Sequence, residues 1–370
     1  ARQVDTDRAG TPEPGEHHDP FSGRPWLASY APGVDPEVVV PGGSLPEMLA
    51  ASGKRFGSRV ALDFFGAETT YAQLADQVSC AANALRIEGV RAGDRVALVL
   101  PNCPQHVVAF YAVLRLGAIV VEHNPLYTAP ELEHQLADCG ATVVVCWDKT
   151  APVIDGLRAR TSVQIILAVD LSRALPWRKR LALLLPVPKA RASRSAMTGP
   201  VPRDVLSWEK VTSSSPRIDA ALPQPGAEDV ALLQYTGGTT GVPKGAVLTH
   251  RNLQANAAQG RAWMPGLNEG EETVYAVLPL FHAYGLTLCL TFAMSIGARL
   301  VLFPKFDEKL VLDAAKHAPP TFLPAVPPIY DRLVTSARSV MRSLVRWRCR
   351  RMSSRPGRRS VEGCWSRATG

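Results

Sequence analysis

Apolar runs alternate with amphipathic stretches along the middle of the chain, and this alternation predicts the fold. Residues 95–100, 119–121 and 142–145 have the composition of buried strands. Residues 104–116 and 129–139, which separate them, have helical periodicity. Strands and helices that alternate at this spacing form a parallel sheet with helices on both faces. The sequence therefore predicts an α/β fold with doubly wound, mostly parallel sheets.

The same rhythm predicts further elements on either side of this block. They are a capped helix start at Ser44, a hairpin over 61–65 and 68–71, a helix from Tyr71 towards Leu85, strands at 230–233, 274–278 and 299–302, and an apolar helix over 285–296. We expect a poorly ordered extension over 1–44, one large domain over 45–337 and a tail of different character over 338–370.

Charge separates the tail from the domain. Residues 338–370 hold ten arginines and one acidic residue, and the rest of the chain holds 31 basic and 32 acidic residues. The net charge of +8 therefore comes from the tail, and it predicts no nucleic-acid partner for the domain. Seven scattered cysteines without metal-ligand spacing favour a reduced, cytoplasmic protein. We see no run as long as a membrane span and no secretory core near residue 1.

A basic insertion over 175–198 interrupts the rhythm. It combines Trp177 and a leucine cluster with six basic residues between 178 and 194. Two interpretations stay open. The segment 175–194 lies on an anionic membrane surface as a peripheral contact, or it is a surface insertion whose leucines pack on the domain.

A glycine- and threonine-rich loop follows the strand predicted at 230–233. Residues 235–245 read Tyr-Thr-Gly-Gly-Thr-Thr-Gly-Val-Pro-Lys-Gly. Glycines let backbone N–H groups approach phosphate oxygens, threonine hydroxyls add donors, and Lys244 adds a positive charge. A plain hairpin turn does not require this composition. The P-loop of ordinary nucleotidases is disfavoured because Pro243 and Gly245 occupy two of its required positions.

This loop resembles the phosphate-binding loop of the AMP-forming adenylating enzymes, which include the acyl-CoA synthetases. Further segments also resemble the family: 70–74, 114–132, 249–252, 279–285, 299–302, 306–307 and 321–330. The Asn-Pro-Leu-Tyr-Thr at 124–128 is similar to the long-chain fatty-acyl subgroup, so the resemblance implies a fatty acid as substrate. In the Pro-Leu-Phe-His of 279–282, a histidine comes just after a predicted strand, where α/β enzymes place functional groups. The alternative from the residues alone is a histidine at a helix start with a packing role.

The resemblance implies a set of substrates, cofactors and site residues. The substrates and cofactors are ATP, Mg²⁺, coenzyme A and a fatty acid. His282 and Lys244 would be catalytic, His282 near the acyl carboxylate. The phosphate-binding residues would be Thr236, Gly237, Gly238, Thr239, Thr240, Gly241 and Lys244, with Thr239 at the metal.

The tail departs from the family pattern. When a back-translation of residues 362–370 is read in another frame, it gives Gly-Leu-Leu-Val-Glu-Gly-Tyr-Gly, which resembles the segment that the family needs next. We therefore expect a shifted reading frame, an incomplete N-terminal domain over 45–337 and no C-terminal lid domain. Two functions remain: a long-chain fatty acid–CoA ligase with impaired catalysis, or a non-catalytic fragment that binds acyl chains or nucleotide.

Overall fold

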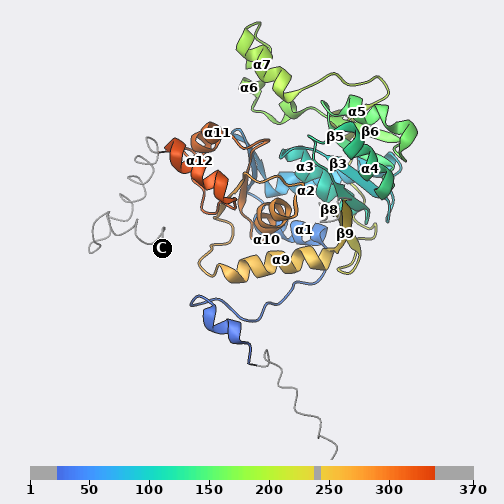
Figure 1. Cartoon of the computed structure of the whole chain (residues 1–370). Helices are drawn as coiled ribbons and strands as arrows, with labels where there is room; N and C mark the ends of the chain where they lie inside the picture. Colours follow the sequence, from blue (N-terminus) through green and yellow to red (C-terminus); the bar gives the residue numbers. More distant parts are fainter. Residues whose placement is uncertain (1–22, 237–242, 338–370) are drawn as a thin grey trace, which may run out of the picture.

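The computed structural model describes residues 23–236 and 243–337, which form two sheets with helices around and between them (Figure 1). The strands are β1 (Val60–Phe64), β2 (Ala67–Thr70), β3 (Arg95–Val99), β4 (Ile119–Glu122), β5 (Val143–Trp147), β6 (Ile165–Val169), β7 (Leu206–Ser207), β8 (Val230–Thr236), β9 (Lys244–Thr249), β10 (Thr273–Ala276) and β11 (Arg299–Leu302). The helices are α1 (Leu45–Arg55), α2 (Tyr71–Ile87), α3 (Pro104–Arg115), α4 (Ala129–Cys139), α5 (Ala151–Gly156), α6 (Trp177–Ala182), α7 (Pro188–Met197), α8 (Trp208–Ser213), α9 (His250–Trp263), α10 (Phe292–Ser295), α11 (Glu308–Ala314) and α12 (Pro327–Ala337).

The larger sheet has seven strands in the order β7-β6-β5-β3-β4-β8-β9. All its pairs are parallel except β8 with the edge strand β9. Chain order runs outward from β3 on both sides, which is the doubly wound arrangement. The predicted α/β class is confirmed, and the carboxyl ends of β3, β4, β5, β6 and β8 meet along one edge.

The smaller sheet has four strands in the order β10-β11-β1-β2. The predicted hairpin is confirmed as the antiparallel pair of β1 and β2. The second partner of β1 was not predictable from local sequence. Strand β1 lies parallel to β11, with Leu62 opposite Leu300.

Strand residues alternate between two cores. Val96 and Leu98 of β3 belong to the core that contains α1, α2 and α3 and also reaches the smaller sheet. Ala97 and Val99 face the second core, which contains α4 and α5. Helix α3 therefore lies between the two sheets, and this explains why its residues from Gln105 to Arg115 are all buried.

One expectation about a helix needs correction. The predicted helix over 285–296 is a π-helix over Gly285–Thr291 followed by the short α10. Gly285 is required there, because a Cβ at this position would lie 2.0 Å from the carbonyl oxygen of Pro279.

The basic insertion over 175–198 has two open interpretations. It forms α6 and α7, which Figure 1 draws projecting from the domain. Leu183 packs against the main core, but Leu181, Leu184 and Leu185 are exposed, contrary to the interpretation in which the leucines pack on the domain. Among the described helices, none combines the length and apolar character needed to cross a bilayer.

Candidate functional site

The predicted phosphate loop starts where β8 ends. Thr236 and Lys244 are opposite each other in the β8–β9 pair, and the Thr236 hydroxyl donates to the Lys244 carbonyl oxygen at 3.4 Å. The Lys244 side chain is exposed. Gly237, Gly238, Thr239, Thr240 and Gly241 lie outside the described residues. The structure thus brings the two ends of the predicted loop together at the carboxyl edge of the larger sheet.

The turn that carries His282 follows β10 of the smaller sheet. Asn102, just after β3, holds this turn with three hydrogen bonds: its amide nitrogen donates to the carbonyls of Ala276 (2.9 Å) and Leu278 (2.8 Å), and its oxygen accepts from the Leu280 N–H (2.8 Å). Asn102 is buried, so these bonds replace water for every polar atom of its amide. A residue of the larger sheet therefore fixes the turn that leaves the smaller one.

A second buried amide connects the two predicted parts of the site. Gln234, two residues before Thr236 in β8, donates from Nε2 to the carbonyl oxygen of Phe281 at 3.0 Å. Phe281 directly precedes His282, so the strand that leads to the loop is bonded to the turn that presents the histidine. Sequence reasoning missed both Asn102 and Gln234; the only signal was an amide placed in or next to an apolar strand.

His282 itself is on the surface side of this turn. Its ring lies against that of Phe281, with centroids 4.8 Å apart, and partial burial lowers the pKa of the imidazole. The lower pKa favours the neutral ring, which can accept a proton or a hydrogen bond.

Buried polar groups lie behind the site, at the end of β4. His106 Nε2 is 2.9 Å from Glu122 Oε1, and both side chains are fully buried. His123 Nδ1 is 2.8 Å from Gln135 Oε1. Burial lowers the pKa of His123 to about 4, and its ring stacks with that of Tyr235. Glu122 and His123 are consecutive residues at the end of β4, so the two pairs lie on opposite faces of the larger sheet. The first pair faces α3 and the second faces α4.

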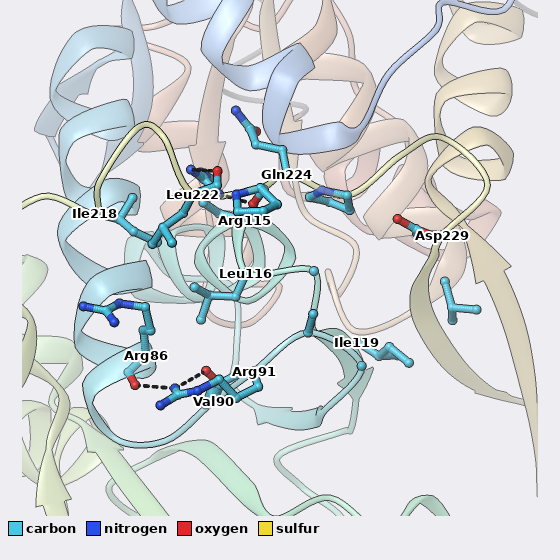
Figure 2. Close-up of a pocket in the computed structure, with 16 residues that line it drawn as sticks. Arg86, Val90, Arg91, Arg115, Leu116, Ile119, Ile218, Leu222, Gln224 and Asp229 are labelled. Carbon is cyan, nitrogen blue, oxygen red and sulfur yellow. Dashed lines mark hydrogen bonds between the residues drawn. The ribbon is translucent and has the colours of Figure 1, made fainter.

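A cavity of about 580 Å³ lies at the opposite, amino edge of the same sheet (Figure 2). Ile119 and Val230, the first residues of β4 and β8, line it together with three arginines. Figure 2 shows Arg91 donating to the carbonyls of Arg86 and Val90, at 2.7 and 2.9 Å. This cavity holds neither Thr236, Lys244 nor His282, so it is separate from the candidate site.

Another cavity, of about 740 Å³, opens at the carboxyl edge beside β5 and β6. Asp148 and Glu209 lie in its wall, and burial raises the pKa of Asp148 to about 7. In the part of the chain that the structure describes, no group of three histidine, cysteine or acidic side chains is arranged to hold a metal ion.

The family model for AMP-binding enzymes matches residues 49–357. The chain belongs to this AMP-binding enzyme family. As a member, it is 36% identical over 318 residues to the long-chain-fatty-acid–CoA ligase of Bacillus subtilis strain 168. The aligned part covers 85% of this chain and 55% of that relative. The AMP-binding chain thus spans about half the length of the curated relatives that it is similar to.

Solved structures agree with the fold of this AMP-binding domain. A long-chain-fatty-acid-CoA ligase from Archaeoglobus fulgidus is similar with a TM-score of 0.68 and 27% identity, over 84% of this chain and 56% of that one. The inhibitor-bound N-terminal domain of FACL13 from Mycobacterium tuberculosis is similar with a TM-score of 0.62 and 25% identity, over 79% of this chain and 65% of that one. The predicted class, sheets of the N-terminal domain of adenylate-forming enzymes, is confirmed.

Proposed function

We propose that the chain carries the ATP- and acyl-binding part of a long-chain fatty acid–CoA ligase, within a domain over 45–337. The reaction would join a fatty acid to AMP with release of diphosphate, and then exchange AMP for coenzyme A. The observation that carries this proposal is the bond from Gln234 to Phe281, because it joins the predicted phosphate end of the site to the predicted acyl end. The relatives' names support the fatty acid as substrate.

The described residues fit these roles by their chemistry. Lys244 would place a positive charge on the outgoing phosphates of ATP. The Thr236 hydroxyl, which donates to the Lys244 carbonyl oxygen in the structure, would turn to donate to the same phosphates. His282, held by its turn, would hydrogen-bond the acyl carboxylate or its adenylate and orient it for attack. Gly237, Gly238, Thr240 and Gly241 would add backbone donors.

Mg²⁺ would neutralise phosphate charge and help to hold the triphosphate in line. The Thr236 hydroxyl is a hard oxygen donor at the loop, and we propose Thr239 as the residue nearest the ion.

ATP binding by the whole chain tests the nucleotide role. In Lys244→Ala, loss of a charge-assisted contact worth about 1.5–3 kcal/mol should weaken ATP binding roughly 10- to 100-fold in calorimetry. The matched control is Lys316→Ala, an exposed lysine paired with Asp313 far from β8 in sequence. Equal ATP affinity of the parent and Lys244→Ala would contradict the assignment.

Fatty-acid-dependent exchange of labelled diphosphate into ATP tests the chemistry. Exchange that requires both palmitate and Mg²⁺ supports the ligase half-reaction. Binding of ATP and palmitate without exchange supports the alternative of a non-catalytic binding protein.

We also propose a peripheral membrane contact through 175–194. Trp177, Leu184 and Leu185 are 67%, 64% and 54% exposed, and six basic residues lie between 178 and 194. Exposed apolar side chains next to lysine and arginine suit an anionic lipid surface. Changing these three residues to serine should abolish pelleting with phosphatidylglycerol vesicles. The control changes three exposed apolar residues elsewhere, Val39, Ile87 and Leu126, to serine; equal loss in both variants would contradict the proposal.

A further inference from the structure

The contact between Gln234 and Phe281 is made inside the protein. Gln234 is 4% exposed and lies in β8 opposite Glu122 of β4. Its Nε2 donates to Phe281, whereas its Oε1 is buried and has no hydrogen-bond partner among the described residues. A buried acceptor without a partner costs free energy that an apolar side chain of similar size would avoid. The position therefore keeps an amide for a reason other than filling the core.

The turn transmits a displacement of Phe281 directly to His282. The His282 N–H donates to the Pro279 carbonyl at 3.2 Å, and the His282 carbonyl accepts from the Leu286 N–H at 2.8 Å. Close contact of Gly285 with the Pro279 carbonyl leaves the turn little room to relax. A backbone fixed at so many points moves as one unit.

The other end of the connection is the start of the phosphate loop. Gln234 and Thr236 are separated by one residue in a strand, so their side chains point to the same face of the sheet. A ligand that displaces the end of β8 would therefore change the distance between the Gln234 amide and the Phe281 carbonyl.

We propose that Gln234 is a positioning residue that couples nucleotide binding at Thr236 and Lys244 to the placement of His282. This rests on the proposed function for its ligands. The shift in position works in both directions, because coupling between two binding sites is reciprocal. ATP would place His282 for the fatty acid, and the fatty acid would tighten ATP.

The experiment uses the 370-residue chain with Gln234→Met, which keeps the length of the side chain but cannot donate. Gln234→Asn keeps an amide that is one methylene too short, and it serves if the methionine variant does not fold. The matched control is Gln254→Met. Gln254 is 2% exposed and also donates to one backbone carbonyl, that of Gly43, at 2.7 Å.

The first measurement is the NMR titration of the imidazole of His282 in histidine-labelled protein, assigned with His282→Gln. Without any ligand, both Gln234 variants should move the His282 resonances and shift the midpoint of their titration, and Gln254→Met should not. Unchanged His282 resonances in a folded Gln234 variant would overturn the proposal. This result does not depend on whether the chain binds ATP.

The second measurement is calorimetric binding of ATP in the absence and presence of palmitate. We expect palmitate to tighten ATP binding about tenfold in the parent and in Gln254→Met, and less than twofold in Gln234→Met. Equal tightening in parent and Gln234→Met would overturn the coupling. A parent that binds neither ligand would instead overturn the proposed function, while the His282 titration still decides the positioning role.

Discussion

The two edges of the seven-stranded sheet differ in how many of their buried polar atoms lack a partner among the described residues. At the amino edge, the guanidinium groups of Arg91 and Arg115 donate to backbone carbonyls of neighbouring segments. At the carboxyl edge, several buried polar atoms have no partner among the described residues. They are Gln105 Oε1, His123 Nε2, Asp148 Oδ1 and Gln234 Oε1. Beside the amino edge, His250 Nε2 also lacks a partner among the described residues. Unpaired buried groups are costly, so their concentration at the carboxyl edge indicates that this edge is organised for ligands.

The largest effect is expected from the buried pair beneath the carboxyl edge. In His106→Leu, the Glu122 carboxylate stays buried without its partner, and the free energy of unfolding should fall by about 3–5 kcal/mol in urea titrations. Arg332→Ala breaks an exposed ion pair with Glu308 and should leave the midpoint unchanged. A similar midpoint for His106→Leu and the parent would mean that the His106–Glu122 pair does not stabilise the fold.

A slightly smaller loss is expected at the amino edge. Arg115 is buried, and its guanidinium donates to the carbonyls of Pro223 and Leu222 at 3.0 and 3.1 Å. Arg115→Met leaves these carbonyls unpaired and should cost about 2–3 kcal/mol in the same titrations. The exposed Arg203→Met is the control. If Arg115→Met proved neutral, the contrast between the edges would fail.

The pH dependence of stability should reveal His123. Burial lowers its folded-state pKa to about 4, below the unfolded value near 6.5. The unfolded chain therefore takes up the proton first, and stability present above pH 6.5 is lost as the pH falls towards 4. The loss at pH 5 should be on the order of 2 kcal/mol.

His123→Gln should remove that part of the difference in unfolding free energy between pH 7.5 and 5. The exposed His317→Gln should retain the parent's full difference. A His123→Gln variant with the parent's pH profile would contradict the assignment of this loss of stability to His123.

The last effect has the opposite sign, because it is a gain in stability. The folded-state pKa of Asp148 is raised to about 7 by burial, so folding becomes less favourable as the pH rises from about 4 to 7 and the carboxyl group must ionise. Asp148→Asn should raise the free energy of unfolding at pH 8 by on the order of 4 kcal/mol and have little effect at pH 4. Asp204→Asn, at an exposed position, is the control. A loss at pH 8 would show that the ionised carboxylate is well paired.

Local sequence predicted the elements better than their partners. The apolar run at 230–233 predicted β8, although the strand continues through Gln234 and Tyr235 to Thr236. The strand expected at 274–278 correctly placed His282 just beyond its end. Periodicity reports only on the local segment in which a residue lies. It therefore could not show that the Gln234 amide contacts the Phe281 carbonyl, which follows a strand of the other sheet.

The pairing of β1 with β11 has a consequence for folding on the ribosome. Leu62 and Leu300 are neighbours in the smaller sheet but about 240 residues apart in sequence. At about 5–20 residues per second, the ribosome needs roughly 10–50 s after synthesis of the β1–β2 hairpin to reach β11, the strand that pairs with β1. Phe64 is fully buried in the folded structure, but during that interval it has no complete core to pack into. We expect nascent chains arrested before residue 299 to bind chaperones that recognise exposed apolar segments, and to release them once β10 and β11 have emerged.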